Sequence, residues 1–261
     1  MNALLLCKIC LLVVGLGVHG LEPPPEDRII NGAKIDISKV PYMLSYMVNG
    51  KHACGAAIVN ERWGLTAAHC VYEFIDNRSV SISVRSGSIW HDFGGVVHRV
   101  TSLVPHEKYE DDSNDYDIAV FKVNEPFRFN NVTQPLKLPE DPRNVTTDWG
   151  LVAGWGYFID DDPVLSEYLQ YVILPKVSRE ECVKDYEDQF EIPERQSCYG
   201  FREGGKDSCK GDSGGPLVNL QHFGIGITSW GADCGEPGLP GVYTNLLDFL
   251  DWVKNKTAIN E

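Results

Sequence analysis

The sequence predicts an all-β protein that ends in one helix, and two observations support this fold class. Short runs rich in β-branched and aromatic residues recur along the chain, at 43–48, 56–59, 80–84 and 118–123. Glycine, asparagine, aspartate and proline separate these runs, as is typical between short strands. Near the C-terminus, an apolar stripe with helical spacing runs through Leu246, Phe249, Leu250 and Val253.

The N-terminus, residues 1–20, is typical of a secretory signal peptide. It carries one lysine, an apolar run over 9–18, and small residues suited to signal-peptidase cleavage at Val18 and Gly20. The apolar run is too short to span a bilayer, and no later segment offers a long uncharged apolar stretch. We therefore expect a soluble, secreted, extracellular protein, and favour this over a membrane anchor.

A propeptide is predicted over residues 21–28. This segment is rich in proline and acidic residues, cannot form regular structure, and ends in the lone basic residue Arg28. The rest of the chain, 29–261, is then the folded domain, and it is long enough for two small β subdomains with a cleft between them. The stretch 125–148, rich in proline and asparagine, is interpreted as their connector.

Charge narrows the class of partner. The 261-residue chain has a formal net charge of -14, which would repel phosphate backbones and anionic lipid surfaces. We expect neither nucleic acid nor a membrane as a partner.

The cysteines predict disulfides. Cys7 and Cys10 leave with the signal peptide, and the remaining six form an even set in an oxidising compartment. Zinc ligation is the alternative, but these six cysteines contain no CxxC knuckle. We expect three disulfides. Each should stabilise the fold by about 3 kcal/mol, because it restricts the conformations of the unfolded chain. They join Cys54 to Cys70, Cys182 to Cys198 and Cys209 to Cys234.

Three segments together supply the groups needed for nucleophilic catalysis. Ser213 stands among glycines in GDSGGP, His69 lies in TAAHC and Asp117 in DYDIAV. A glycine-rich segment alone could be a turn. Serine is a poor nucleophile at neutral pH, however, and a base with an orienting acid is what activates it. The three segments therefore indicate a serine hydrolase.

These segments, in the order His, Asp, Ser, resemble those of the trypsin and chymotrypsin family of serine proteases. Four further segments resemble family signatures in their expected order: IING from Ile29, GWG from Gly154, SWG from Ser229 and PGVY from Pro240. The resemblance implies two packed six-stranded antiparallel β-barrels with a C-terminal helix. The α/β-hydrolases share GxSxG but place acid and histidine after the serine, where only His222 follows closely, so that fold is excluded.

The resemblance also implies a role for each catalytic residue. Ser213 would attack the scissile carbonyl, His69 would take its proton and return it to the leaving amine, and Asp117 would hold the imidazole tautomer. The backbone amides of Gly211 and Ser213 would form the oxyanion hole. No cofactor is implied.

Specificity for Arg or Lys is implied by Asp207, which the likeness to trypsin places at the base of the primary pocket. A desolvated carboxylate there rewards a cationic side chain and leaves an unpaired charge beneath an apolar one. Small residues at Gly231 and Gly241 keep the pocket open. The other substrate-binding residues implied are Ser208, Ser229 and Trp230.

A zymogen is implied as well. Cutting after Arg28 would free the Ile29 ammonium, which in relatives pairs with the carboxylate at the position of Asp212 and organises the site. Glu26 and Asp27 precede the cut, so we expect a different protease as activator.

Several residues depart from the family pattern. Gly150 and Asn219 stand where many relatives carry a further disulfide. Ser88 stands where calcium-binding trypsins have a carboxylate, so no metal site is expected. Pro240 argues against a sodium switch. Lys210, beside the oxyanion hole, leads us to expect a preference for acidic residues flanking the cut bond. Sequons permit N-glycans at Asn77, Asn131, Asn144 and Asn255.

Two alternatives remain open. One is a catalytically silent homologue that only binds a partner, although such chains usually lose a triad residue. The other is a narrow cascade protease, which the lack of a cysteine-knotted regulatory module in the propeptide disfavours relative to digestion or tissue-protein breakdown. The expected partners are protein or peptide substrates, an activating protease and protein protease inhibitors, with the chain itself a monomer.

Overall fold

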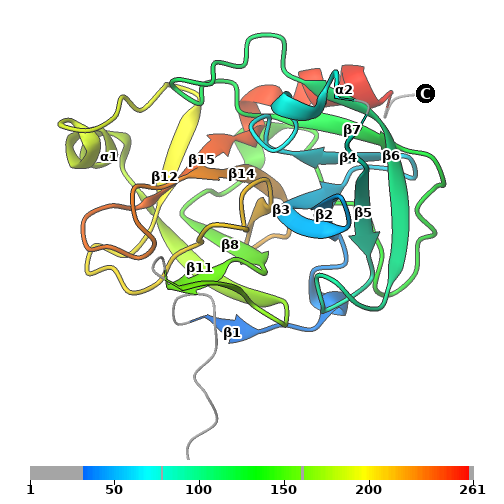
Figure 1. The fold of residues 1–261 in the computed structure, drawn as a ribbon. Coiled ribbons are helices and arrows are strands. Elements are labelled where there is room, and N and C mark those ends of the chain that lie inside the picture. The colour runs from blue at the N-terminus through cyan, green and yellow to red at the C-terminus, as the bar shows by residue number, and fades with distance from the viewer. Residues whose placement is uncertain (1–31, 78, 160–161, 259–261) are drawn as a thin grey trace, which may run out of the picture.

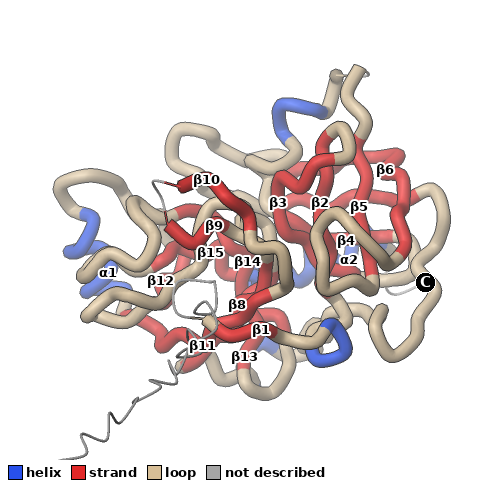
Figure 2. Tube along the Cα trace, turned by 60° about the horizontal axis from the view of Figure 1, so that its bottom comes forward, coloured by secondary structure: helices blue, strands red, loops and turns tan. Residues whose placement is uncertain are grey.

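The computed structural model describes residues 32–77, 79–159 and 162–258. The predicted signal peptide and propeptide, and Ile29, lie outside this range. Two β-barrels lie side by side (Figure 1), and strands make up most of the regular structure (Figure 2). The predicted fold class is confirmed. Among the described residues, no helix has the length and apolar character that crossing a membrane requires.

The first barrel closes in the strand order β2-β3-β4-β7-β6-β5. Its core includes Tyr46 and Phe121, whose rings meet edge to face at 5.9 Å between centroids. Gly64 faces the Phe121 ring so closely that a Cβ would lie 2.2 Å from it, so only glycine fits there. The strands are β2 (Met43–Val48), β3 (Lys51–Ile58), β4 (Trp63–Thr66), β5 (Ile82–Ser86), β6 (Val96–Pro105) and β7 (Ala119–Val123).

The second barrel contains six strands that follow in the order β11-β12-β15-β14-β13-β8, and pairing of β8 with β11 closes it. A separate hairpin of β9 (Tyr157–Ile159) and β10 (Asp162–Leu165) projects from it. The strands of the barrel are β8 (Trp149–Gly154), β11 (Gln170–Val177), β12 (Gln196–Tyr199), β13 (Pro216–Asn219), β14 (Gly224–Trp230) and β15 (Gly241–Asn245).

Each end of the described chain packs on the barrel that lies farther from it in sequence. Strand β1 (Ala33–Lys34) leads into the first barrel but pairs with β11 of the second. Helix α2 (Leu250–Thr257) follows the second barrel but buries Val253 against the first, and Asn60 donates to the Thr257 carbonyl at 3.1 Å. These two contacts link the barrels.

The strand runs expected from sequence correspond to β2, β3, β5 and β7. The predicted C-terminal helix consists of a 3-10 turn, η4 (Leu246–Phe249), followed by α2. Helix α1 (Arg179–Tyr186) was not predicted, although Ser178 and Glu181 form a capping box that signals its start. The remaining 3-10 turns are η1 (Ile37–Lys39), η2 (Tyr72–Phe74) and η3 (Pro142–Asn144).

All three expected disulfides are confirmed, with the expected partners. Cys54 and Cys70 lie near His69, and the three together have the spacing of a metal-binding group. Because the two sulfurs are bonded to each other, they are not thiolate ligands.

Candidate functional site

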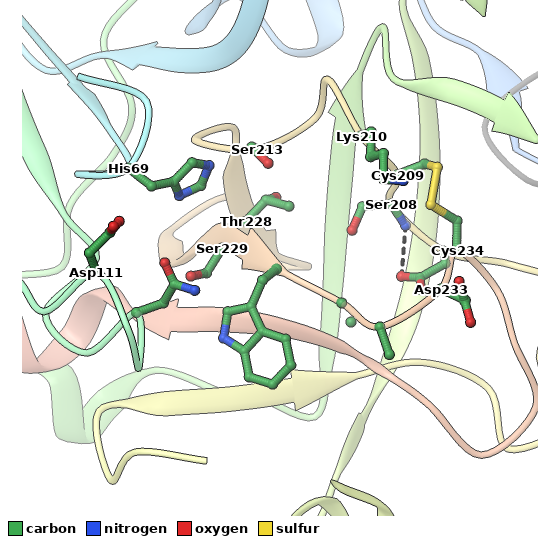
Figure 3. Close-up of a pocket in the computed structure, with 16 residues that line it drawn as sticks. His69, Asp111, Ser208, Cys209, Lys210, Ser213, Thr228, Ser229, Asp233 and Cys234 are labelled. Atoms are coloured by element: carbon green, nitrogen blue, oxygen red, sulfur yellow. Dashed lines mark hydrogen bonds between the residues drawn. A yellow bond between two sulfur atoms is a disulfide. The ribbon is translucent and has the colours of Figure 1, made fainter. Parts of the chain in front are cut away.

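A cavity of about 380 Å³ opens between the two barrels (Figure 3). His69, Asp111 and Asn114 line it from the first barrel. The second barrel lines it with Asp207, Ser208, Lys210, Ser213, Ser229 and Trp230. His69 and Ser213 lie next to each other in Figure 3, and Ser208 lies farther from His69. Asp207 lines the same cavity. The structure therefore brings together most of the residues singled out from the sequence.

Ser213 is held by backbone hydrogen bonds to both barrels. Its carbonyl accepts from the Gly55 amide of β3 at 2.8 Å, and the Gly214 amide donates to the Thr228 carbonyl of β14 at 2.8 Å. Gly214 has φ +79, and a Cβ there would lie 2.1 Å from the Thr66 hydroxyl. Glycine thus lets the loop turn tightly, with the Ser213 side chain left in the cavity.

The imidazole of His69 and the carboxylate of Asp117 meet because β4 and β7 pair antiparallel. Thr66 at the end of β4 pairs with Ala119 at the start of β7. His69 follows Thr66 by three residues and Asp117 precedes Ala119 by two, so both lie at the same edge of the barrel. Nδ1 of His69 lies 2.8 Å from Oδ2 of Asp117, and the His69 backbone amide donates to Oδ1 at 2.9 Å. Nε2, the other ring nitrogen, lies 3.5 Å from the Sγ of Cys70, and the His69 side chain lines the cavity.

Asp117 is fully buried, and the second barrel also contacts it. The Ser229 hydroxyl donates to its Oδ2, and the Thr244 hydroxyl donates to its backbone carbonyl at 2.8 Å. Burial alone would lower the pKa of His69, but the charge and hydrogen bond of Asp117 outweigh it and raise the pKa, with a smaller contribution from Asp111. Such an imidazole can take a proton from a neighbouring hydroxyl and hold it beside the buried carboxylate.

Asp207 lines the cavity, with 3% of its surface exposed. Its carboxylate accepts from the amides of Ser208 at 2.8 Å and Gly235 at 3.2 Å. Burial raises its pKa to about 7, against the lowering effect of these amides. A Cβ on Gly241 would lie 2.8 Å from Oδ1, so glycine keeps this carboxylate open to the cavity.

Gly211 adopts φ +98, and a Cβ there would lie 2.9 Å from Leu165. Its carbonyl accepts from Nε2 of His52 at 2.9 Å, which orients the peptide. Burial lowers the pKa of His52 to about 4, so the ring is neutral, and its Nδ1 lies 2.8 Å from the Ser45 hydroxyl. Sequence reasoning gave His52 no role at the site.

Asp212, directly before Ser213, is another buried carboxylate and is 1% exposed. It accepts from the amides of Gly156 at 2.8 Å and Cys209 at 3.0 Å. Burial raises its pKa to about 6. Its expected partner, the Ile29 ammonium, lies outside the described residues.

Comparisons with known proteins agree with this geometry. Residues 29–253 match the family model described as Trypsin. The chain belongs to the trypsin family of serine proteases. It is 36% identical over 250 residues to Trypsin 5G1 of Aedes aegypti, covering 93% of this chain and 92% of that protein. It is also 36% identical over 247 residues to the Vitellin-degrading protease of Bombyx mori, covering 94% and 92%.

Sequence reasoning missed several cavity residues of this trypsin-family protease: Asp111, Asn114, Thr228, Ala232 and Asp233. Asp111 and Asn114 lie on the loop before Asp117, and the Tyr109 hydroxyl is 3.0 Å from the Asp111 carboxylate and 3.2 Å from the Asn114 side-chain oxygen. Their signal in the sequence was closeness to Asp117, since a loop that delivers a catalytic acid also borders the cleft.

The loop around Ser88 is organised by an internal cation. The guanidinium of Arg85 donates to the carbonyls of His91 at 3.2 Å, Asp92 at 2.8 Å and Gly94. The Ser88 hydroxyl donates to the Phe93 carbonyl at 2.6 Å. In this trypsin-family protein, the Arg85 guanidinium therefore already binds three carbonyls of this loop.

Gly150 and Asn219 directly oppose each other on β8 and β13. This is the arrangement expected of positions that a disulfide joins in relatives. Here the Asn219 amide donates to the Thr146 carbonyl at 2.9 Å. A side-chain hydrogen bond therefore takes part in linking these segments of the trypsin-family chain.

Proposed function

We propose that this protease is an endopeptidase that cuts polypeptides after Arg or Lys. The observation that carries the proposal is the buried carboxylate of Asp207 in the lining of the cavity that Ser213 and His69 border. An arginine or lysine side chain would supply the charge that this carboxylate lacks, and would favour its ionised form. An apolar side chain would leave it desolvated and unpaired, which costs about 3 to 5 kcal/mol when one partner of a buried pair is removed.

In the proposed mechanism, Ser213 attacks the carbonyl carbon while His69 accepts the hydroxyl proton. Asp117 keeps the other ring nitrogen protonated and stabilises the imidazolium that forms. The amides of Gly211 and Ser213 donate to the developing oxyanion, each such donor being worth about 3 kcal/mol of barrier. His69 then returns the proton to the leaving amine, and water repeats the sequence to release the acid.

We further propose secretion and activation by cleavage between Arg28 and Ile29. Support comes from Asp212, a buried carboxylate whose pKa is raised by burial and which would gain a cation from the new Ile29 ammonium. The three disulfides suit an oxidising compartment. The side chains of Asn77, Asn131, Asn144 and Asn255 are exposed and open to N-glycosylation.

For the physiological role, we propose breakdown of bulk protein in digestion or in tissue, rather than a narrow cascade step. One relative is named a trypsin and another a vitellin-degrading protease, and both names fit such roles. Partners would be protein substrates, an activating protease and protein inhibitors that fill the cleft.

The test is cleavage of a peptide library by the purified precursor after activation at Arg28. We expect cuts after Arg and Lys, and no cuts by the Ser213→Ala variant treated in the same way. Cuts after apolar residues would reject the specificity. A wild type that neither cuts nor reacts with a serine-directed fluorophosphonate would reject the enzyme itself and favour a silent homologue. An Arg28→Gln precursor should stay inactive with the same activator.

A further inference from the structure

The loop that delivers Asp117 is strained on both sides of Asp115. Asn114 has φ 51 and Tyr116 has φ 55, in the left-handed region that non-glycine residues seldom adopt. Such conformations persist where surrounding contacts over-determine them, and they gather at functional sites. The contacts that hold this loop are therefore of interest.

Arg195 of the second barrel grips the centre of this loop. Its Nε donates to Oδ1 of Asp115 at 2.8 Å, and its Nη2 donates to Oδ2 in a short hydrogen bond. Asp115 is 8% exposed. The guanidinium also lies over the Tyr116 ring, 4.3 Å from its centroid, and the ring stacks on His106 at 4.7 Å.

The neighbouring residue Gln196 makes a second contact from the same strand end. Its amide donates to the Asn114 carbonyl at 2.9 Å, while its oxygen accepts from the indole of Trp230 at 3.2 Å. Arg195 itself is anchored, because its carbonyl accepts from the Asn245 amide at 2.8 Å. The start of β12 thus holds both strained residues of the loop from across the barrel interface.

We propose that Arg195 is a positioning residue for catalysis, acting through Asp115 to set the carboxylate of Asp117 against His69. Asp117 follows Tyr116 directly, so tilting the loop moves its carboxylate relative to the ring nitrogen and the amide of His69. Arginine suits this task because its planar fork binds both carboxylate oxygens and fixes direction as well as distance. The inference rests on the proposed catalytic roles of His69 and Asp117.

The chain offers a matched control in the pair Arg143 and Asp141. It has the same bidentate geometry, with Nε and Nη2 at 2.8 to 3.2 Å from the carboxylate oxygens. The Arg143 side chain is 86% exposed, and its partner lies two residues away in the same loop, so this pair joins no separate elements. Removing it tests loss of an arginine fork without loss of positioning.

The experiment compares the activated wild type with Arg195→Gln, Arg195→Lys and Arg143→Gln. It measures kcat and KM on an arginyl peptide, and Ki for benzamidine, a small cation that probes the Asp207 pocket without needing the triad. A small misplacement of a catalytic group can cost up to about 100-fold, so we expect kcat of Arg195→Gln to fall about 10- to 100-fold. Lysine, which cannot form the fork, should give an intermediate kcat, while KM and Ki stay within about twofold. Arg143→Gln should match the wild type.

An unchanged kcat in Arg195→Gln would overturn the proposal. So would a rise in benzamidine Ki in proportion to the fall in kcat, since that pattern reports a general loosening of the cleft. Arg195→Gln leaves the Asp115 carboxylate without its partner, and this could prevent folding. In that case the double variant Asp115→Asn with Arg195→Gln removes both charges. For the proposal to stand, its kcat must fall at least fivefold while the benzamidine Ki is unchanged. A wild type inert to a fluorophosphonate would instead reject the proposed function, and this inference with it.

Discussion

Two buried aspartates, Asp117 beside His69 and Asp207 in the lining of the cavity, have opposite surroundings. The Asp117 carboxylate is fully buried and accepts from the amide and the ring of His69 and from the Ser229 hydroxyl. Asp207 accepts from two backbone amides and lines the open cavity. The carboxylate of Asp117 is thus satisfied within the protein, whereas in our proposal Asp207 receives its cation from a substrate. The first is suited to orient a base and the second to select a side chain.

The largest expected effect on the difference between the two aspartates is the loss of kcat in Asp117→Asn. An amide there favours the wrong imidazole tautomer, and kcat should fall by about 10⁴-fold, the size of effect typical of this change in serine proteases. Benzamidine Ki should stay unchanged, because Asp207 is untouched. Steady-state kinetics with inhibitor titration would measure both, and equal losses in both would contradict the division.

Asp207→Asn should produce the opposite pattern. Removing one partner of a buried ion pair costs about 3 to 5 kcal/mol, so kcat/KM on arginyl and lysyl peptides should fall by about 200- to 5,000-fold. The rate of inactivation by a small uncharged fluorophosphonate should remain near that of the wild type, because the triad is intact. Loss of that reactivity would show that the roles of the two aspartates are not separable.

The same variant should be more stable than the wild type above about pH 7. Burial raises the pKa of Asp207 to about 7, so between the ordinary aspartate range and that value the folded state binds more protons than the unfolded state. The unfolding free energy of the wild type therefore falls as pH rises towards about 7, and asparagine removes this contribution. Thermal melts of both proteins across this pH range would measure the difference, and a variant less stable than the wild type at every pH would contradict it.

Benzamidine affinity should depend on pH through the same carboxylate. The ionised form binds the cation, so Ki should rise as pH falls below about 7, and binding near that pH should release protons. Calorimetry in buffers of different ionisation enthalpy would count them. Asp207→Asn is the control and should lack the proton release, whereas release that persists in this variant would assign it to another group.

The smallest expected effect concerns Lys210, which lines the cavity and is exposed. Exposed charge pairs are worth at most about 1 kcal/mol, so Lys210→Gln should reduce a preference for acidic flanking residues by no more than about fivefold. Library profiling at low and high salt would measure it. Equal cleavage beside acidic and basic flanks in the wild type would remove the idea.

Local motifs carried most of the site in the sequence. A nucleophile among glycines, a histidine beside a cysteine and an aspartate just before a strand have signatures within six residues. What the sequence did not reveal depends on contacts between distant segments. The hydrogen bond from His52 to Gly211 spans 159 residues, and the grip of Arg195 on Asp115 spans 80. Neither residue has a local pattern that marks it.

The packing of each chain end on the other barrel also depends on contacts between distant segments. Strand β1 contains two residues, too few for a periodic signal, and it forms because β11 offers an edge. Helix α1 is different, since the Ser178 and Glu181 capping box was present and went unused.

The most direct test of the account compares two peptides that differ at one residue, arginine or citrulline, its neutral counterpart of nearly the same shape. If the charge of Asp207 selects the substrate, the activated wild type should cleave the arginyl peptide at least about 100-fold more efficiently, and Asp207→Asn should bring the two close together. Equal kcat/KM for the two peptides in the wild type would contradict the account.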